Sequence, residues 1–134
     1  MLLHAQTKKW SEGPKMNNAR YFHGCTTIPS TVERNAQFIV VGGHHSESTV
    51  EILDVSSNSW FNVANTPLPG LFANSLTVSN SPEYKLYSIG GSPSDRAIFG
   101  LTQSDAWVHV GNLTEVRADH ASLNVDKKDI PGCA

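Results

Sequence analysis

Histidines are the residues whose type and spacing first point to chemistry in this sequence. There are six of them, and His44 and His45 are adjacent, directly after Gly42-Gly43 and close to Glu47. Neighbouring imidazoles can both bind a transition metal, but a stable protein site generally needs a third ligand. We expect His44 and His45 to be exposed residues of a polar loop, with no metal or other cofactor bound.

The sequence lacks the patterns that accompany common catalytic sites. Serine, histidine and aspartate are present, but no Gly-x-Ser-x-Gly turn and no glycine-rich loop followed by lysine occurs. Carboxylates such as Glu47 and Glu51 are close in sequence, yet nothing around them indicates a pocket. We therefore predict that the protein is not an enzyme.

Two cysteines, Cys25 and Cys133, are too few for a disulfide scaffold, and no Cys-x-x-Cys pair indicates structural zinc. We expect Cys25 to be a small buried hydrophobe in a strand. Cys133 lies near the end of the sequence, and a partner for it outside this chain remains open.

Charge and hydropathy exclude two further classes. The net charge is -2 and the longest basic clusters are the pairs Lys8-Lys9 and Lys127-Lys128, a poor footprint for nucleic acid. No apolar run approaches the ~20 residues that span a bilayer.

No export signal is visible at the amino terminus, which weakly favours the cytoplasm. An extracellular location stays open, and only there would the sequon Asn112-Leu113-Thr114 matter.

A repeat with a period near fifty residues organises the chain. Trp10, Trp60 and Trp107 are 50 and 47 residues apart, and the pairs Gly42-Gly43 and Gly90-Gly91 are 48 apart. Each glycine pair follows a short apolar run rich in β-branched or aromatic residues, which is typical of a strand. Glycines at its end permit the tight turn and close backbone approach that a Cβ would block.

The opening of each unit also repeats. Arg20-x-x-His23 has the same spacing as Arg117-x-x-His120, whereas the middle unit has Leu71 and Asn74 in that register. Between the glycine pair and each later tryptophan lies a strand followed by a polar turn, the pattern of a hairpin.

The repeat predicts four strands in each unit and almost no helix. We expect strands near 21–28, 36–42, 49–54 and 59–64, then near 72–79, 84–89, 97–102 and 106–111. The corresponding division is 1–12 as the tail of a preceding unit, 13–62 and 63–111 as two complete units, and 112–134 as the start of a third.

These features together resemble the kelch repeat. That pattern has Arg and His near its first strand, a Gly-Gly pair after an apolar run, then a later aromatic residue, Asp and Trp. This sequence supplies Arg20, His23, Phe38-Ile39-Val40-Val41-Gly42-Gly43, Asp54 and Trp60, and repeats most of them with Leu86-Tyr87-Ser88-Ile89-Gly90-Gly91 and Trp107. Leu53 and Leu101, where kelch repeats usually have Tyr, depart from the pattern, as do Leu71 and Asn74.

The resemblance implies an all-β fold, a partial kelch β-propeller of four-stranded antiparallel blades. Complete propellers have ~4 to 8 blades, so two blades and two fragments need neighbours from a longer chain or from self-association. It also implies a non-catalytic scaffold that binds a protein or peptide partner. Two alternatives remain: a fragment of a kelch-type enzyme, similar to galactose oxidases or sialic acid epimerases, whose site lies in missing blades, and a purely architectural segment.

Kelch domains that bind peptides often present arginines near blade starts. The resemblance therefore makes Arg20 and Arg117 candidate contacts for carboxylates, because a guanidinium is a planar bidentate donor. In the alternative role each arginine packs locally and bonds loop carbonyls. The full set of candidate partner-binding residues is Arg20, His23, His44, His45, Arg117 and His120.

Overall fold

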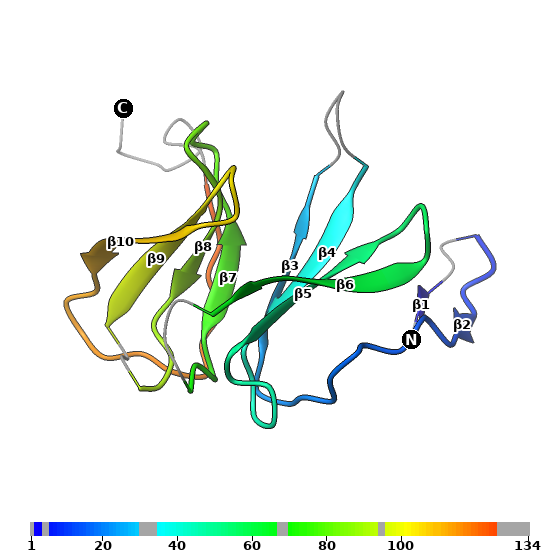
Figure 1. Ribbon diagram of the computed structural model, residues 1–134, viewed down its shortest axis with the longest axis horizontal. Coiled ribbons are helices and arrows are strands. Elements are labelled where there is room, and N and C mark those ends of the chain that lie inside the picture. Colours follow the sequence, from blue (N-terminus) through cyan, green and yellow to red (C-terminus); the bar gives the residue numbers. More distant parts are fainter. Residues whose placement is uncertain (1, 4–5, 30–34, 67–69, 94–95, 126–134) are drawn as a thin grey trace.

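The computed structural model describes residues 2–3, 6–29, 35–66, 70–93 and 96–125. Within these ranges the protein is all-β, with two four-stranded antiparallel sheets and one two-stranded hairpin (Figure 1). The expected fold class is therefore confirmed at this level. The described residues include no helix that could cross a membrane. Cys133 lies outside the described residues.

The first sheet has the strand order β3-β4-β5-β6, and the second has β10-β9-β8-β7. Their bounds are β3 Gly24–Ile28, β4 Gln37–Val41, β5 Thr49–Asp54, β6 Ser59–Asn65, β7 Ser75–Val78, β8 Tyr84–Ile89, β9 Ala97–Thr102 and β10 Trp107–Asn112. Each of the eight strands overlaps one of the ranges that the repeat predicts.

The innermost strand of each sheet starts three residues later than expected. Phe22 and Ala73 have φ values of 55° and 56°, outside the range of an extended strand. The residues before them, Tyr21 and Phe72, form only isolated bridges with His44 and Ser92. A turn with positive φ therefore separates each bridge from the strand that follows.

The three tryptophans occupy equivalent positions in three hairpins. Trp60 pairs with Leu53 and Trp107 with Leu101, across the last two strands of each sheet. Strand β1, Leu2–Leu3, and strand β2, Trp10–Ser11, form a separate hairpin in which Leu3 pairs with Trp10. Two residues before each tryptophan the backbone has positive φ, and these positions are Lys8, Asn58 and Asp105.

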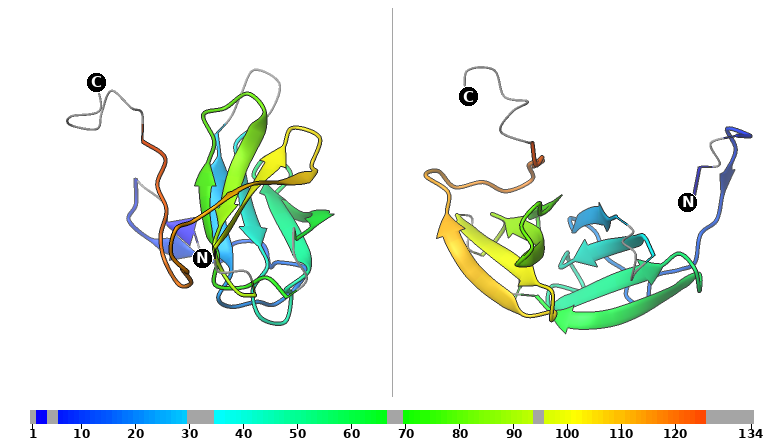
Figure 2. Two further views of the ribbon diagram at one scale, coloured as in Figure 1. Left: turned by 90° about the vertical axis from the view of Figure 1, so that its left-hand side faces the viewer. Right: turned by 90° about the horizontal axis from the view of Figure 1, so that it is seen from above.

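The core lies between the two sheets, which stand side by side with β3 next to β7 (Figure 2). Alternating residues of the first sheet face it, because successive side chains of a strand point to opposite faces. The buried cluster comprises Ile28, Ile39, Val41, Val50, Ile52, Leu71, Leu76, Leu86 and Leu101, with Val63 and Trp107 packed against it. Burial of this apolar area is the main force that holds the sheets together.

Glycine pairs allow the backbone of the next unit to approach each sheet. A Cβ on Gly42, whose φ is +65°, would lie 2.2 Å from the Leu71 carbonyl oxygen. Gly43 N donates to Leu71 O at 2.9 Å, and Ala73 N donates to Phe22 O at 2.7 Å. These two bonds fix the second sheet against the first.

The same contacts recur after the second sheet. Gly91 N donates to Arg117 O at 2.9 Å, and Asp119 N donates to Ala73 O at 3.0 Å. Asp119 has a φ of 51°, as Phe22 and Ala73 do. The segment 117–125 therefore lies against the second sheet as the segment 71–78 lies against the first.

Candidate partner-binding surface

Arg20 lies in the interior of the first unit. Its side chain is fully buried in an ion pair with Glu51. It also donates to Gly42 O at 2.8 Å, Thr49 O at 3.2 Å and Thr49 Oγ1 at 2.9 Å. This geometry matches the second of the two roles considered for Arg20, local packing with hydrogen bonds to loop carbonyls, and it leaves no guanidinium surface for a partner.

Glu51 holds this arrangement from the other side. Its carboxylate accepts hydrogen bonds from Asn17 N at 2.7 Å and from Asn18 Nδ2 at 3.1 Å. Burial by itself raises the pKa of Glu51, but these donors and the Arg20 guanidinium outweigh it, so the pKa lies below its usual range.

His23 and His120 meet at a hollow of about 260 Å³ beside β3 and β7. The middle unit contributes Asn74, in the register of the two histidines. The lining consists of three equivalent triplets, 23–25, 74–76 and 120–122. Among the described residues no hydrogen-bond partner meets His23 Nδ1, Asn74 Oδ1 or either ring nitrogen of His120. Burial, followed by the nearby charge of Arg20, lowers the pKa of His23, which favours the neutral imidazole.

Cys25 belongs to this hollow and not to the core. It lies in β3 as expected, but its side chain is exposed, so the expectation of burial was wrong. The alternation of β3 explains the difference, because Gly24 and Ile28 are buried while Cys25 faces the open hollow. Partial desolvation still raises the pKa of the Cys25 thiol.

His44 and His45 join an exposed aromatic cluster. Tyr21 stacks on His44 with ring centroids 5.0 Å apart, and His45 meets the edge of Tyr21 at 5.5 Å. Phe22 contacts Tyr21 at 5.2 Å, and Phe72 from the next unit contacts His44 at 4.5 Å. We call these five residues, Tyr21, Phe22, His44, His45 and Phe72, the aromatic rim.

The aromatic rim is exposed and has one acidic neighbour. Tyr21 and Phe22 expose 49% and 57% of their surface, high values for large apolar side chains. Glu47 Oε1 lies 3.4 Å from His44 Nδ1 and accepts from His45 N at 3.1 Å. The hydrogen bond from its own backbone N–H lowers the pKa of Glu47 most. Burial opposes it, and the hydrogen bond from His45 N–H and the charges of His44 and His45 lower the pKa further.

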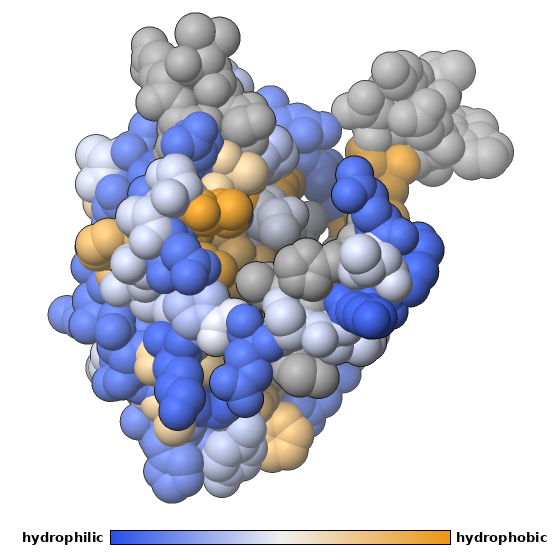
Figure 3. Space-filling model, turned by 90° about the vertical axis from the view of Figure 1, so that its right-hand side faces the viewer, coloured by the Kyte–Doolittle hydropathy of each residue, from blue (hydrophilic) through white to orange (hydrophobic). Residues whose placement is uncertain are grey.

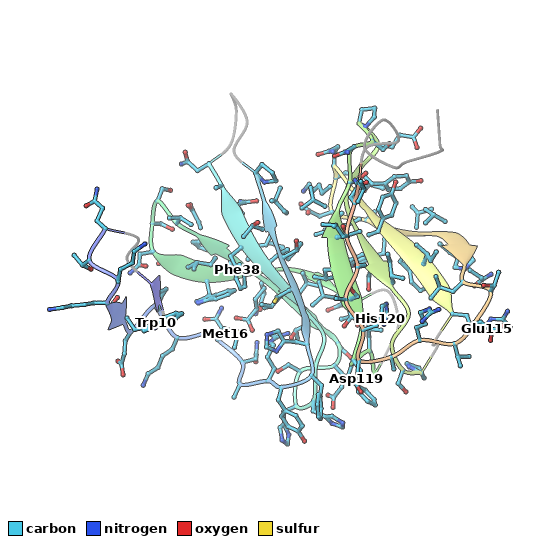
Figure 4. The ribbon with its side chains drawn as sticks, turned by 180° about the vertical axis from the view of Figure 1, so that it is seen from behind. Trp10, Met16, Phe38, Glu115, Asp119 and His120 are labelled. Carbon is cyan, nitrogen blue, oxygen red and sulfur yellow. The ribbon has the colours of Figure 1, made fainter. Side chains whose placement is uncertain are left out.

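Arg117 is exposed, beside the second glycine pair. It occupies the position of Arg20 and Leu71 in the repeat. Figure 4 shows its neighbours Glu115, Asp119 and His120 on one side of the molecule, and Trp10, Met16 and Phe38 on the other.

The sequence motifs drew attention to the histidines but missed Tyr21, Phe22 and Phe72. A signal for them was available, because Tyr21 and Phe72 occupy the same position of the repeat, directly before the positive-φ turn residue. Within the described ranges no group of three or more His, Cys, Asp or Glu residues is arranged to hold a metal ion.

Comparison with known proteins adds no family to this geometry. No protein-family description matches the chain, and no curated protein sequence matches it.

Proposed function

We propose that the chain is a segment of a kelch-type β-propeller that binds a protein or peptide partner through the aromatic rim, without catalysing a reaction. The propeller part of the proposal is supported by the repeated geometry. Two sheets of the same strand order carry tryptophan, glycine-pair and positive-φ residues in the same places, and a third hairpin and a third inner segment repeat part of it.

The aromatic rim is the main support for the proposed binding role. It gathers four aromatic or imidazole side chains from the first unit and one from the second on a single exposed surface. Rigid aromatic side chains lose little conformational entropy on binding and supply most of the energy at protein interfaces. Two sheets hold the loops in place, so little order has to be gained when a partner binds.

Phe22 is the most informative residue for a test. A bulky side chain at a φ of 55° costs about 1–2 kcal/mol of backbone strain, and more than half of the surface of this residue is exposed. The equivalent turn positions have Ala73 and Asp119, so the turn itself does not need an aromatic side chain. A strained, exposed phenylalanine is better explained by contact with a partner than by stability.

The experiment selects peptides from a random phage-displayed library on the full chain and measures their affinity by fluorescence anisotropy. Phe22→Asn should weaken binding of the selected peptides by roughly tenfold or more. Because asparagine tolerates positive φ, the variant should be as stable as the parent protein or more stable.

Phe61→Asn is the matched control, because Phe61 is 50% exposed on β6 and does not belong to the aromatic rim. It should leave peptide affinity unchanged. Equal affinity of the parent and Phe22→Asn proteins, or equal losses in both variants, would remove the rim from the binding site.

A further inference from the structure

Two incomplete pieces of one unit lie at the two ends of the described chain. The hairpin β1–β2 repeats the last two strands of a sheet, because Leu3 pairs with Trp10 as Leu53 pairs with Trp60. Among the described residues it pairs with no further strand. The segment 117–125 repeats the start of a unit, and within the described ranges it has no hairpin of its own.

The second sheet has an outer face that is only partly covered. Its residues Tyr87, Ile89 and Ile98 occupy the register of Ile39, Val41 and Val50 in the first sheet. Those three are completely buried against the second sheet, whereas Tyr87, Ile89 and Ile98 are half-buried. The segment 117–125 lies along β7, where Asn124 Nδ2 donates to Val78 O at 2.9 Å and the hydroxyls of Ser122 and Ser75 are 2.6 Å apart.

Along β10 the same face is open. Val108 and Val110 are 43% and 40% exposed. Val110 has the register of Val63, which packs against the core between the sheets. From the second sheet Trp107 packs against the same core cluster, and its counterpart in the hairpin β1–β2 is Trp10, which is 61% exposed. The open face and the exposed indole are therefore the two halves of a contact that the molecule already makes once.

The first sheet is open on its opposite side. A hollow of about 570 Å³ lies there, lined by Met16, Phe38 and Trp60 among others. Figure 3 shows this side, with apolar side chains gathered in a recess between polar ones. Phe38 is half-buried, whereas its counterpart Leu86 is completely buried between the sheets.

The two incomplete pieces lie at opposite sides of the molecule (Figure 2). We propose that a second copy of this chain docks head to tail, so that its β1–β2 hairpin covers the outer face of the second sheet beside segment 117–125. Trp10 of that copy packs against Ile98 and Val110, in the way that Trp107 packs against the core cluster to which Val50 belongs. The interface is heterologous, so the rotation between copies decides whether the assembly closes into a ring. The aromatic rim takes no part in this contact.

Sedimentation velocity of the full chain across a wide concentration range tests the docking. The parent protein should shift from monomer to dimer or larger closed assembly as concentration rises. Trp10→Ser should raise the dissociation constant roughly tenfold or more, because a buried indole is a typical interface anchor. Val55→Ser is the matched control, since Val55 is 62% exposed in the turn between β5 and β6 and does not line the hollow beside the first sheet, and it should associate like the parent protein.

A mixing experiment identifies the two surfaces. Trp10→Ser and Val110→Asp each lose one half of the contact, and each keeps the half that the other lacks. A mixture of the two variants should therefore associate more tightly than either variant alone. A parent protein that stays monomeric, a Trp10→Ser variant that associates normally, or a mixture no better than its components would overturn the proposal.

Discussion

At the residue scale, the buried pair of Arg20 and Glu51 shows how polar groups stabilise the first unit. The guanidinium connects the glycine pair to β5, and the carboxylate binds the backbone and side chain of the loop before Arg20. Every strong partner of Glu51 is a donor, so the charged form is favoured despite burial. Breaking such a pair leaves an unpaired buried charge, which typically costs about 3–5 kcal/mol.

His23 gives a prediction about pH. Burial and Arg20 lower the pKa of His23 from its ordinary 6.5, so the unfolded chain binds a proton at a higher pH than the folded protein. The free energy of unfolding should therefore fall as pH drops below about 6.5, until His23 titrates in the folded state. The contribution of Glu51, whose pKa is also lowered, is present above its ordinary value and is lost in a separate, more acidic step.

Urea unfolding at a series of pH values measures both steps. His23→Asn should remove the first step, because the equivalent position of the second unit, Asn74, already has an uncharged amide in the same hollow. His109→Asn, at an exposed position of β10, should keep it. A first step of unchanged size in His23→Asn would show that another group causes it.

At the element scale, the sequence predicted the strands well and the contacts between loops poorly. Short apolar runs and glycine pairs are local signals, so all eight strands of the two sheets overlap the expected ranges, and only the starts of β3 and β7 lie as much as three residues later than expected. The Arg20–Glu51 pair joins residues 31 apart, and the aromatic rim joins loops of two units. Such contacts depend on how the sheets pack. The burial of Cys25 was predicted wrongly for the same reason.

Glycine substitutions test how closely the elements approach each other. Gly42→Ala adds a Cβ at 2.2 Å from the Leu71 carbonyl oxygen, at a φ of +65°. The strain and the clash with backbone should lower the free energy of unfolding by about 2–5 kcal/mol. Gly111→Ala adds a Cβ with no atom within 4 Å and no positive φ, so it should change stability little. Chemical denaturation of both variants measures the difference, and equal effects would contradict the role of the Gly42 approach.

At the scale of the whole molecule, the two sheets share one strand arrangement but bury different side chains. Arg20 and Leu71 each precede the positive-φ turn residue by two positions. Glu51 lies two residues before Leu53, the partner of Trp60, and Phe99 lies two residues before Leu101, the partner of Trp107. The second unit therefore replaces both members of the ion pair with apolar side chains, an exchange that protein interiors often tolerate. Alignment of the units within this sequence revealed the loss of Arg and His from the middle unit, but not the matching change at Phe99.

Transplanting the ion pair into the second unit tests whether the two interiors are interchangeable. Leu71 is 1% exposed, so Leu71→Arg alone buries an unpaired charge and should lower the free energy of unfolding by about 3–5 kcal/mol. Adding Phe99→Glu should restore roughly half of that loss or more, because the carboxylate then occupies the register of Glu51. Phe99→Glu alone should also destabilise the protein. If the double variant then loses less stability than the two single losses added together, the difference is the coupling energy and shows that the two side chains meet. Urea unfolding of the four proteins measures the cycle. Additive losses in the double variant would mean that positions 71 and 99 do not meet as positions 20 and 51 do, and that the two units share strand order without sharing the geometry of their interiors.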